Sequence, residues 1–199
     1  MKKTLLAVFI TLSIFANAQS FKKGQVDINL GIGFGNTFIA SPFTTSSTPV
    51  SIALEFGVSD ALSIGGYFTS MKAEWQVSGT ANCNSGNGNG NFAYTYIDKY
   101  TWTYNIAGLR AAYHFTPQND KLDAYGGLML GNNFASSTFS TVTSPYCDKH
   151  EVVFTGKDYG GFIAAAFLGA RYRFTNNIGV YGELGYGVTY LNLGLNLRF

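Results

Sequence analysis

The last nine residues of the chain, Leu191 to Phe199, alternate strictly between two kinds of side chain. Successive side chains of a β-strand point to opposite faces, so this alternation predicts a strand with one apolar and one polar face. One such strand is compatible with many folds, whereas a chain that consists of many such strands can adopt only a few. The apolar positions are Leu191, Leu193, Leu195, Leu197 and Phe199, and Asn192, Gly194, Asn196 and Arg198 stand between them.

The same alternation recurs in seven earlier segments, so the sequence predicts eight strands in all. An even number of antiparallel strands is typical of single-chain outer-membrane barrels. The connections after the first, third and fifth strands are long (residues 36–49, 71–99 and 132–159), and those after the second, fourth and sixth are short. The seventh, near Val188, is an exception, because it is short although it lies on the side of the long ones. This asymmetry predicts short periplasmic turns and long extracellular loops. The seven segments are residues 24–38, 49–58, 62–70, 100–115, 122–130, 161–174 and 178–187.

One predicted strand breaks the pattern. In residues 100–115, the apolar positions Trp102, Tyr104 and Ile106 are out of phase with those that follow Gly108. An extra residue in a strand shifts the phase, and glycine commonly marks such β-bulges. We therefore expect a bulge near Gly108.

The N-terminal residues 1–18 have the three parts of a secretory signal peptide. Lys2 and Lys3 form the positive start, residues 5–15 the apolar core, and residues 16–18 (Ala-Asn-Ala) the small-residue cleavage pattern. The apolar run is short for a transmembrane helix. We expect residues 1–18 to be cleaved and residues 19–199 to form a single barrel domain.

Composition narrows the class of protein further. Loss of Lys2 and Lys3 reduces the 13 basic residues to 11, which equals the number of acidic residues. Neutral charge and export both argue against nucleic acid as a partner. Charged residues are only 12% of the chain, which is low for a soluble domain. An exported chain with apolar character and no long apolar helix favours a closed β-barrel, which satisfies its backbone within lipid.

Alternation alone does not decide which face points outward, and an exported soluble barrel of the lipocalin type shows the same pattern. The face opposite the apolar one consists of Gly, Ala, Asn, Tyr and Arg, which make a poor soluble surface. Aromatic residues such as Phe56, Phe115 and Phe174 gather at strand ends, as in a membrane-interface girdle. We therefore predict an all-β fold, an eight-stranded antiparallel up-and-down transmembrane β-barrel, in the bacterial outer membrane.

The C-terminal strand resembles the sorting signal of outer-membrane barrels, with alternating apolar residues, an internal glycine and a terminal aromatic residue. With the strand count, residues 19–199 resemble the small porin-type barrels of the OmpA, OmpX and OmpW kind. The resemblance implies a monomer in outer-membrane lipid whose last strand pairs with its first. It also implies that the barrel-assembly machinery reads the insertion signal during biogenesis. The signal residues are Leu191, Leu193, Gly194, Leu195, Leu197 and Phe199.

If the apolar face points outward, the charged residues of the strands point into the lumen. The interior of an eight-stranded barrel is just wide enough for side chains to fill. Acids and arginines in similar numbers pair there through charge-assisted hydrogen bonds. We expect a structural polar network that plugs the barrel. Its members are Asp27, Glu55, Arg110, His114, Asp123, Arg171, Arg173, Glu183 and Arg198.

Two other roles for the lumen stay open at this point. Arg110 and Glu183 could line a narrow path for protons or ions. The lumen aromatics, among them Tyr67 and Phe167, could also hold a small apolar solute above the charges, as in an OmpW-like carrier.

The sequence predicts no catalytic residue, metal site or cofactor. A lipid-modifying barrel enzyme, the remaining alternative, would need a serine–histidine pair near the outer leaflet. The chain has only two histidines, His114 at the periplasmic end and His150 in an external loop, and no spacing identifies a nucleophile. Cys83, Cys147, Asp148 and His150 likewise lack a recognised metal-ligand spacing.

The two cysteines lie in two different long loops of an exported chain. Export to an oxidising compartment and an even count predict a disulfide between Cys83 and Cys147. The long loops are rich in Ser, Thr, Asn and aromatic residues. Such a composition suits an extracellular protein or glycan ligand without distinguishing between them.

Overall fold

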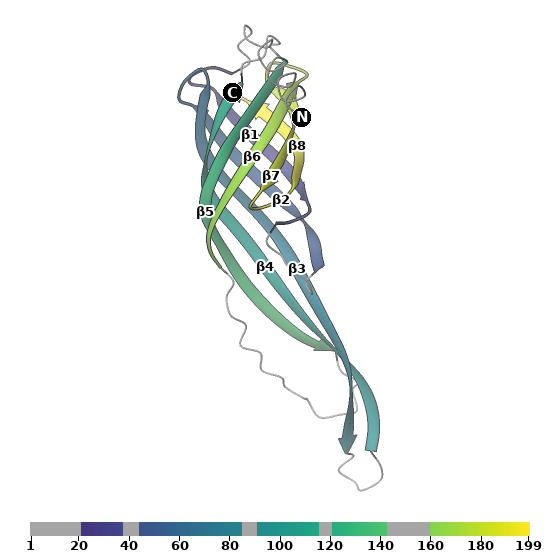
Figure 1. The fold of residues 1–199 in the computed structure, drawn as a ribbon. Coiled ribbons are helices and arrows are strands. Elements are labelled where there is room, and N and C mark those ends of the chain that lie inside the picture. The colour runs from purple at the N-terminus through teal and green to yellow at the C-terminus, as the bar shows by residue number, and fades with distance from the viewer. Residues whose placement is uncertain (1–20, 38–43, 85–90, 116–120, 143–159) are drawn as a thin grey trace, which may run out of the picture.

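A computed structural model describes residues 21–37, 44–84, 91–115, 121–142 and 160–199. Eight antiparallel strands form a closed barrel in which each strand pairs with its chain neighbours and the last pairs with the first (Figure 1). The predicted fold class is confirmed. The strands are β1 (Val26–Phe34), β2 (Thr44–Gly57), β3 (Leu62–Asn84), β4 (Asn91–Phe115), β5 (Leu122–Val142), β6 (Gly161–Arg173), β7 (Ile178–Tyr186) and β8 (Leu191–Arg198).

The barrel closes where β1 meets β8. The backbones of Val26 and Phe199 exchange two hydrogen bonds, of 3.1 and 2.9 Å. The pairing then runs from Asp27 opposite Arg198 to Phe34 opposite Leu191. Closure leaves this part of the sheet without an open edge, as a strand structure in lipid requires. Within the described part of the chain, no helix is long and apolar enough to cross a membrane.

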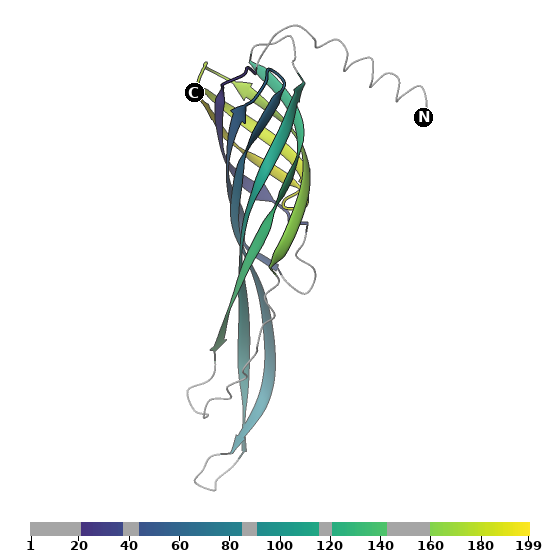
Figure 2. The same ribbon diagram turned by 90° about the vertical axis from the view of Figure 1, so that its left-hand side faces the viewer.

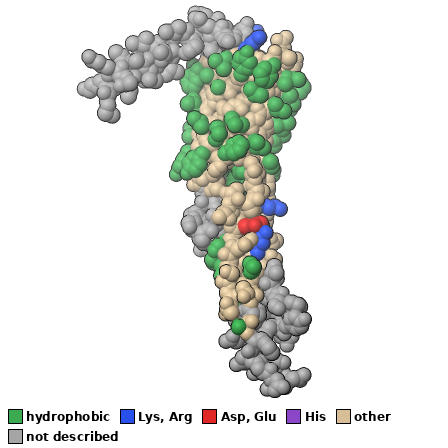
Figure 3. Space-filling view, turned by 90° about the vertical axis from the view of Figure 1, so that its right-hand side faces the viewer, with side chains coloured by type: hydrophobic (Ala, Val, Ile, Leu, Met, Phe, Trp, Pro, Cys, Tyr) green, Lys and Arg blue, Asp and Glu red, His purple; other side chains and the backbone are tan. Residues whose placement is uncertain are grey.

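The exterior of the barrel is apolar and its interior is charged, the reverse of a soluble barrel. Leu109, Leu128 and Leu184 are 76, 65 and 62% exposed. Apolar side chains cover the barrel in Figure 3, and charged groups gather beyond one end of this band. Burial of charge inside, with leucine outside, rules out the soluble alternative and makes lipid the surroundings of the wall.

Charged side chains mark both ends of the apolar band. Lys22, Lys23 and Lys121 are exposed at the end where β2 turns into β3, which we call the periplasmic end because short turns face the periplasm. Near this end Tyr172 and Phe174 form an edge-to-face pair on the exterior, with ring centroids 5.6 Å apart. Such amphipathic and aromatic side chains are enriched at membrane interfaces.

Three strands continue beyond the rest of the barrel at the other end. β2 pairs with β3 only as far as Glu74, and β6 pairs with β5 only as far as Asn133. Beyond these points β3, β4 and β5 form a three-stranded sheet that projects from the barrel (Figures 1 and 2). We call residues 75–84, 91–101 and 134–142 the extension.

Some residues of the expected long loops are in fact part of strands. Residues 71–84 and 91–99 are strand, as are residues 44–49 and 132–142, so each of the three predicted long connections contains residues that belong to strands. The reason is physical. Above the lipid, the outward face changes from leucine and phenylalanine to polar residues such as Lys72, Gln76 and Thr101. The alternation continues there, but without the apolar outer face by which the strands were identified.

The bulge expected near Gly108 is wrong. Gly108 lies opposite Tyr67 in β3 and Gly131 in β5, in a register without interruption on either side. Trp102 and Ile106 instead face the lumen, with exposures of 4 and 0%. The change of phase therefore marks the level at which the lumen becomes apolar. The register shifts are in β2, between Thr45 and Val50, where Pro49 lacks an N–H to donate.

Candidate functional site in the barrel lumen

The periplasmic half of the lumen holds a buried ionic cluster. Arg198 donates to both oxygens of the Asp27 carboxylate, Nε to Oδ1 at 2.9 Å and Nη2 to Oδ2 at 2.8 Å. Arg171 is fully buried and contacts three carboxylates, those of Asp27 (3.5 Å), Asp123 (3.4 Å) and Glu55. Each guanidinium presents several donors in a plane, so one arginine can neutralise more than one acid.

A second ion pair lies farther from the periplasm. Nη2 of Arg110 donates to Oε1 of Glu183 at 2.6 Å, and its Nε lies 2.9 Å from Oε1 of Glu55. The hydroxyl of Tyr125 donates to the same Glu183 oxygen at 2.9 Å. Glu55 therefore connects Arg110 to Arg171, and the ionic groups form one continuous network across the lumen.

Aromatic rings pack against both central arginines. The guanidinium carbon of Arg171 lies 4.1 Å from the ring centroid of Tyr125, and that of Arg110 lies 3.9 Å from the ring centroid of Phe167. Cation–π contacts of this kind strengthen when water is excluded. Gly169 makes room for the Tyr125 ring, since a Cβ there would lie 2.7 Å from the Cζ atom of that ring. Glycine in the lumen wall thus admits the large rings.

Ser63, His114 and Asp123 form a hydrogen-bonded chain within the cluster. The Oγ atom of Ser63 lies 2.9 Å from Nε2 of His114, and Nδ1 of His114 lies 2.9 Å from Oδ1 of Asp123. This is the order of groups in a nucleophile–base–acid triad. All three are buried, and Phe21 stacks on the His114 ring with 3.6 Å between centroids. The Phe21 ring covers one face of the imidazole, and His114 as a whole is only 1% exposed, so the ring is closed to a substrate.

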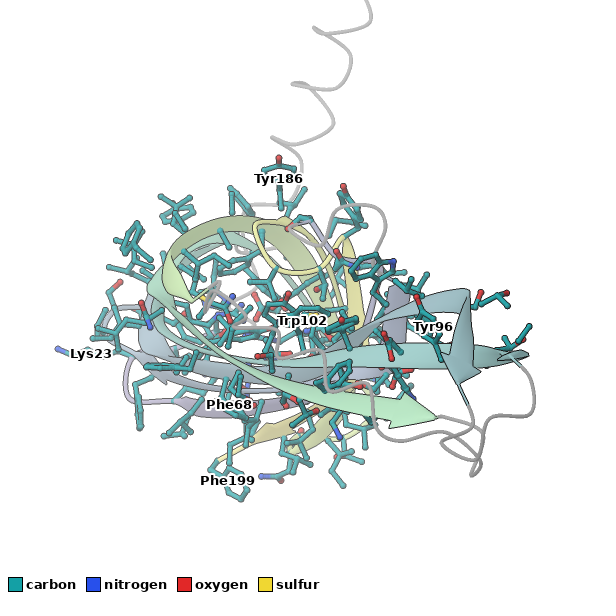
Figure 4. All side chains as sticks on the ribbon, turned by 90° about the horizontal axis from the view of Figure 1, so that it is seen from below. Lys23, Phe68, Tyr96, Trp102, Tyr186 and Phe199 are labelled. Atoms are coloured by element: carbon teal, nitrogen blue, oxygen red, sulfur yellow. The ribbon has the colours of Figure 1, made fainter. Side chains whose placement is uncertain are left out.

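The outer half of the lumen is filled by apolar and aromatic side chains. Trp102 lies inside the ring of strands in the end-on view of Figure 4, whereas Tyr186 and Phe199 lie outside it. This layer, which we call the apolar plug, was missed because the same residues were interpreted as a bulged strand. Their switch of phase at Gly108 was the available signal. The apolar plug consists of Met71, Ala73, Trp102, Tyr104, Ile106, Met129 and Val188, and Ala53, Tyr67 and Tyr100 belong to the same buried cluster.

A small cavity lies between the ionic network and the apolar plug. Tyr67, Arg110, Phe167 and Glu183 line it on one side and Met129 on the other. Its volume is about 30 Å³. A cavity of about 10–15 Å³ is enough to hold one water molecule, so this cavity has room for no more than a few.

The nine residues predicted for the lumen network are all buried in the lumen. Eight of them take part in its ion pairs, and Arg173 is 5% exposed beside them at the periplasmic end. Ser63 joins them through His114; the alternation of residues 62–70 places it on the lumen face, but no sequence signal pointed to this contact. Cys147, His150 and the signal peptide lie outside the described residues, and Cys83 is described only as a backbone position in β3. Among the residues that the structure describes, no three His, Cys, Asp or Glu side chains could hold a metal ion.

Comparison with known proteins returns similar structures only. No family model and no curated protein matches the chain. The N-terminal β-barrel domain of OprF from Pseudomonas aeruginosa is 13% identical, with a TM-score of 0.47, over 89% of this chain and 98% of that one. Ail from Yersinia pestis, solved with the heparin analogue sucrose octasulfate, is 13% identical (TM-score 0.45, 89 and 99% covered). OprG from Pseudomonas aeruginosa is 9% identical (TM-score 0.48, 92 and 99% covered).

The assignment to the membrane rests on the chain's own features. A closed ladder of eight strands, an apolar exterior and a charged, filled interior together satisfy the requirements of a barrel in lipid. This architecture fits the small outer-membrane barrels that the C-terminal strand resembles.

Proposed function

We propose that this outer-membrane β-barrel is a closed anchor that holds the extension outside the membrane for contact with a surface ligand. The observation that carries the proposal is the filling of the lumen by two stacked layers. The ionic network occupies the periplasmic half and the apolar plug the outer half. A solute would have to pass through both.

Energetics support a closed lumen. An ion passing Arg110 and Glu183 would have to displace a 2.6 Å contact between two buried groups. Breaking one partner away from a buried ion pair costs about 3–5 kcal/mol, because the other charge is left without compensation. The apolar plug beyond offers a permeating ion no polar group in exchange for its water. The proposed ion path through Arg110 and Glu183 is therefore disfavoured.

The carrier alternative is disfavoured by size. Pockets for small molecules usually measure about 300–1,000 Å³. The cavity beside Arg110 measures about 30 Å³. The triad-like chain at Ser63 is equally unsuited to catalysis, since Phe21 covers it, and we propose that it serves to hold β3, β4 and β5 together.

The test is the single-channel conductance of the refolded mature protein in a planar bilayer. A heat-dependent shift in gel mobility should first show that the barrel is folded. We expect no discrete conductance steps from the folded wild-type protein. Regular steps that scale with salt concentration would overturn the closed anchor and restore the pore.

Two expectations about biogenesis also remain proposals. The outward leucines of β8, together with Phe199, would be read by the assembly machinery as the insertion signal. The closing of β8 against β1 is consistent with this, since insertion must end by joining these two strands. Replacing Phe199 with Ser should then lower the amount of folded barrel in the outer membrane without changing the unfolding of the protein that does insert.

A further inference from the structure

The extension has two faces of different character. The outer face continues the lipid-facing wall and carries Lys72, Glu74 and Lys99 at its base, followed by serines and threonines. The inner face continues the lumen wall and is aromatic. We call it the aromatic face. Its members are Trp75, Val77 and Gly79 of β3, Tyr96, Asp98 and Tyr100 of β4, and Phe139 of β5.

The rings of the aromatic face contact one another across the strands. Trp75 stacks on Tyr100 with 5.4 Å between ring centroids, and Phe139 meets Tyr100 at 5.0 Å. Tyr96 lies across Gly79, because a Cβ at that glycine would be 2.8 Å from the Cε1 atom of its ring. Figure 4 shows Tyr96 far out along the extension and Trp102 close to the barrel axis. The rings thus form a strip that leads outward from the apolar plug.

A single carboxylate lies within this strip. Asp98 stands between Tyr96 and Tyr100 on β4 and opposite Val77 of β3, and it is only 7% exposed. It is the one charged residue among the described positions of the aromatic face; Lys72 and Lys99 belong to the opposite face. Burial raises the pKa of the Tyr100 hydroxyl, and the negative charge of Asp98 raises it further. The Asp98 carboxylate therefore interacts electrostatically with the hydroxyl of Tyr100.

An ionised carboxylate shielded from water is costly unless a positive charge accompanies it. Aromatic ring faces carry negative electrostatic potential and attract cations, and several rings around one site recognise quaternary ammonium groups. The aromatic rings and the carboxylate of the aromatic face therefore both favour a cationic ligand. We propose that the aromatic face binds a small soluble molecule that carries a quaternary ammonium group, with Asp98 as its counter-charge and Trp75, Tyr100 and Phe139 as its walls.

This assignment rests on the proposed function, because it makes the extension the part of the protein that meets a ligand. A quaternary ammonium group has an apolar surface and a full positive charge, so it suits ring faces beside one acid. Phe139 is 38% exposed and Trp75 is half-buried, so a ligand can reach the strip at these two rings, whereas Tyr100 and Asp98 are more deeply buried, at 8 and 7%.

The chain offers a built-in reporter for a binding experiment. It has two tryptophans, Trp75 and Trp102, and both flank Tyr100. We would titrate the folded full-length mature protein in detergent with choline chloride and follow tryptophan emission at constant ionic strength. The matched control ligand is 3,3-dimethylbutanol, which has the shape of choline and no charge. The expected result is a saturable change with choline and none with the neutral analogue.

Two variants on the same strand pair separate the aromatic face from general charge effects. Asp98→Asn removes the counter-charge and should weaken choline binding at least about tenfold, as expected for loss of a charge-assisted contact. Glu74→Gln removes a carboxylate from the opposite face, and it should leave the affinity unchanged. A shift in gel mobility on heating checks that both variants are folded.

Three results would overturn the proposal: no saturable change with choline, equal affinity in Asp98→Asn, or equal binding of 3,3-dimethylbutanol. Binding that appears only when Lys149 and Lys157 are both changed to Ala would also overturn it, since the chain's own lysines would then be the cations for Asp98. None of these results bears on conductance. If the barrel neither conducts nor binds choline, the proposed ammonium site is wrong and the proposed closed anchor is still supported.

Discussion

Asp27 and Arg198 face each other across the junction of the first and last strands, and two hydrogen bonds of 2.9 and 2.8 Å join their side chains. The pair therefore reinforces the backbone closure of the barrel from inside the lumen. Asn196 of the same strand also donates to Asp27, at 3.3 Å. The junction is held by side chains as well as by the β-ladder.

Asp27→Asn should destabilise the barrel. The amide keeps the shape of the side chain but leaves Arg198 and Arg171 with one carboxylate fewer, so we expect a loss of about 3 kcal/mol in the free energy of unfolding. Urea titration of the protein folded in lipid vesicles measures this. Asp60→Asn, at an exposed turn, is the control and should change stability by less than about 0.5 kcal/mol. Equal effects would show that the junction does not depend on the pair.

The Arg110→Ala, Glu183→Ala double variant should remain silent in a planar bilayer. The Arg171 cluster lies on one side of this pair and the apolar plug on the other, so its loss alone opens no path. The double variant should also be more stable than Glu183→Ala, which leaves Arg110 buried with one partner fewer. Discrete conductance from the double variant would instead show that the pair is the gate.

Ser63 should not react as a nucleophile. A fluorophosphonate probe needs access to the hydroxyl, and Ser63 is fully buried beside a histidine that Phe21 covers. We expect no labelling of the folded protein, and a cost of about 1–3 kcal/mol in stability for Ser63→Ala, which deprives buried His114 of a hydrogen bond. Labelling that disappears in Ser63→Ala would identify an enzyme.

Leu168→Arg should be strongly destabilising. Leu168 is 57% exposed at the middle of the apolar band, and arginine on the lipid face near the midplane costs about 2–4 kcal/mol. Ser136→Arg, on the outer face of the extension, is the matched change beyond the lipid and should cost little. Comparison of the two by urea titration in vesicles locates the membrane along the barrel. Equal costs would contradict this position.

The disulfide between Cys83 and Cys147 remains a prediction. The backbone of Cys83 pairs with Phe92 five residues beyond the Ser78–Ile97 pair, and β5 ends at Val142 opposite Ile97. Cys147 follows Val142 by five residues, and an extended chain covers about 3.3 Å per residue, so its reach matches that distance. A non-reducing gel should show faster migration for the wild-type protein than for Cys83→Ser. Identical mobility would argue against the bond.

The alternation in the sequence was sufficient to predict the number of strands and, within the lipid-facing part of the wall, which residues point outward. Within the membrane, the outer surface of the barrel contacts only lipid. Each outward residue must therefore be apolar, and the alternation shows unambiguously which residues point outward. The same alternation identifies the residues that face the lumen. Asp27, Glu55 and Arg171 could be assigned to the interior without knowledge of any contact.

The sequence could not predict which acid each arginine contacts. Arg171 of β6 meets Glu55 of β2 across the lumen, and that contact depends on the register of every strand between them. The contact of Ser63 with the cluster could not be predicted either, because it also depends on the register of the strands.

Outside the lipid, Trp102 and Tyr104 face inward while threonines face outward. The rule that apolar residues face outward therefore does not apply there.

The unbroken register of β3 with β4 limits how the extension can evolve. One residue inserted into β4 near Tyr100 would turn every following side chain to the other face, and the aromatic strip would change sides with the serines and threonines. Insertions of two residues, matched in β3, keep the faces and lengthen the sheet. Related chains should therefore differ in the length of these strands by even numbers, and should vary more freely in length where β3 and β4 are joined.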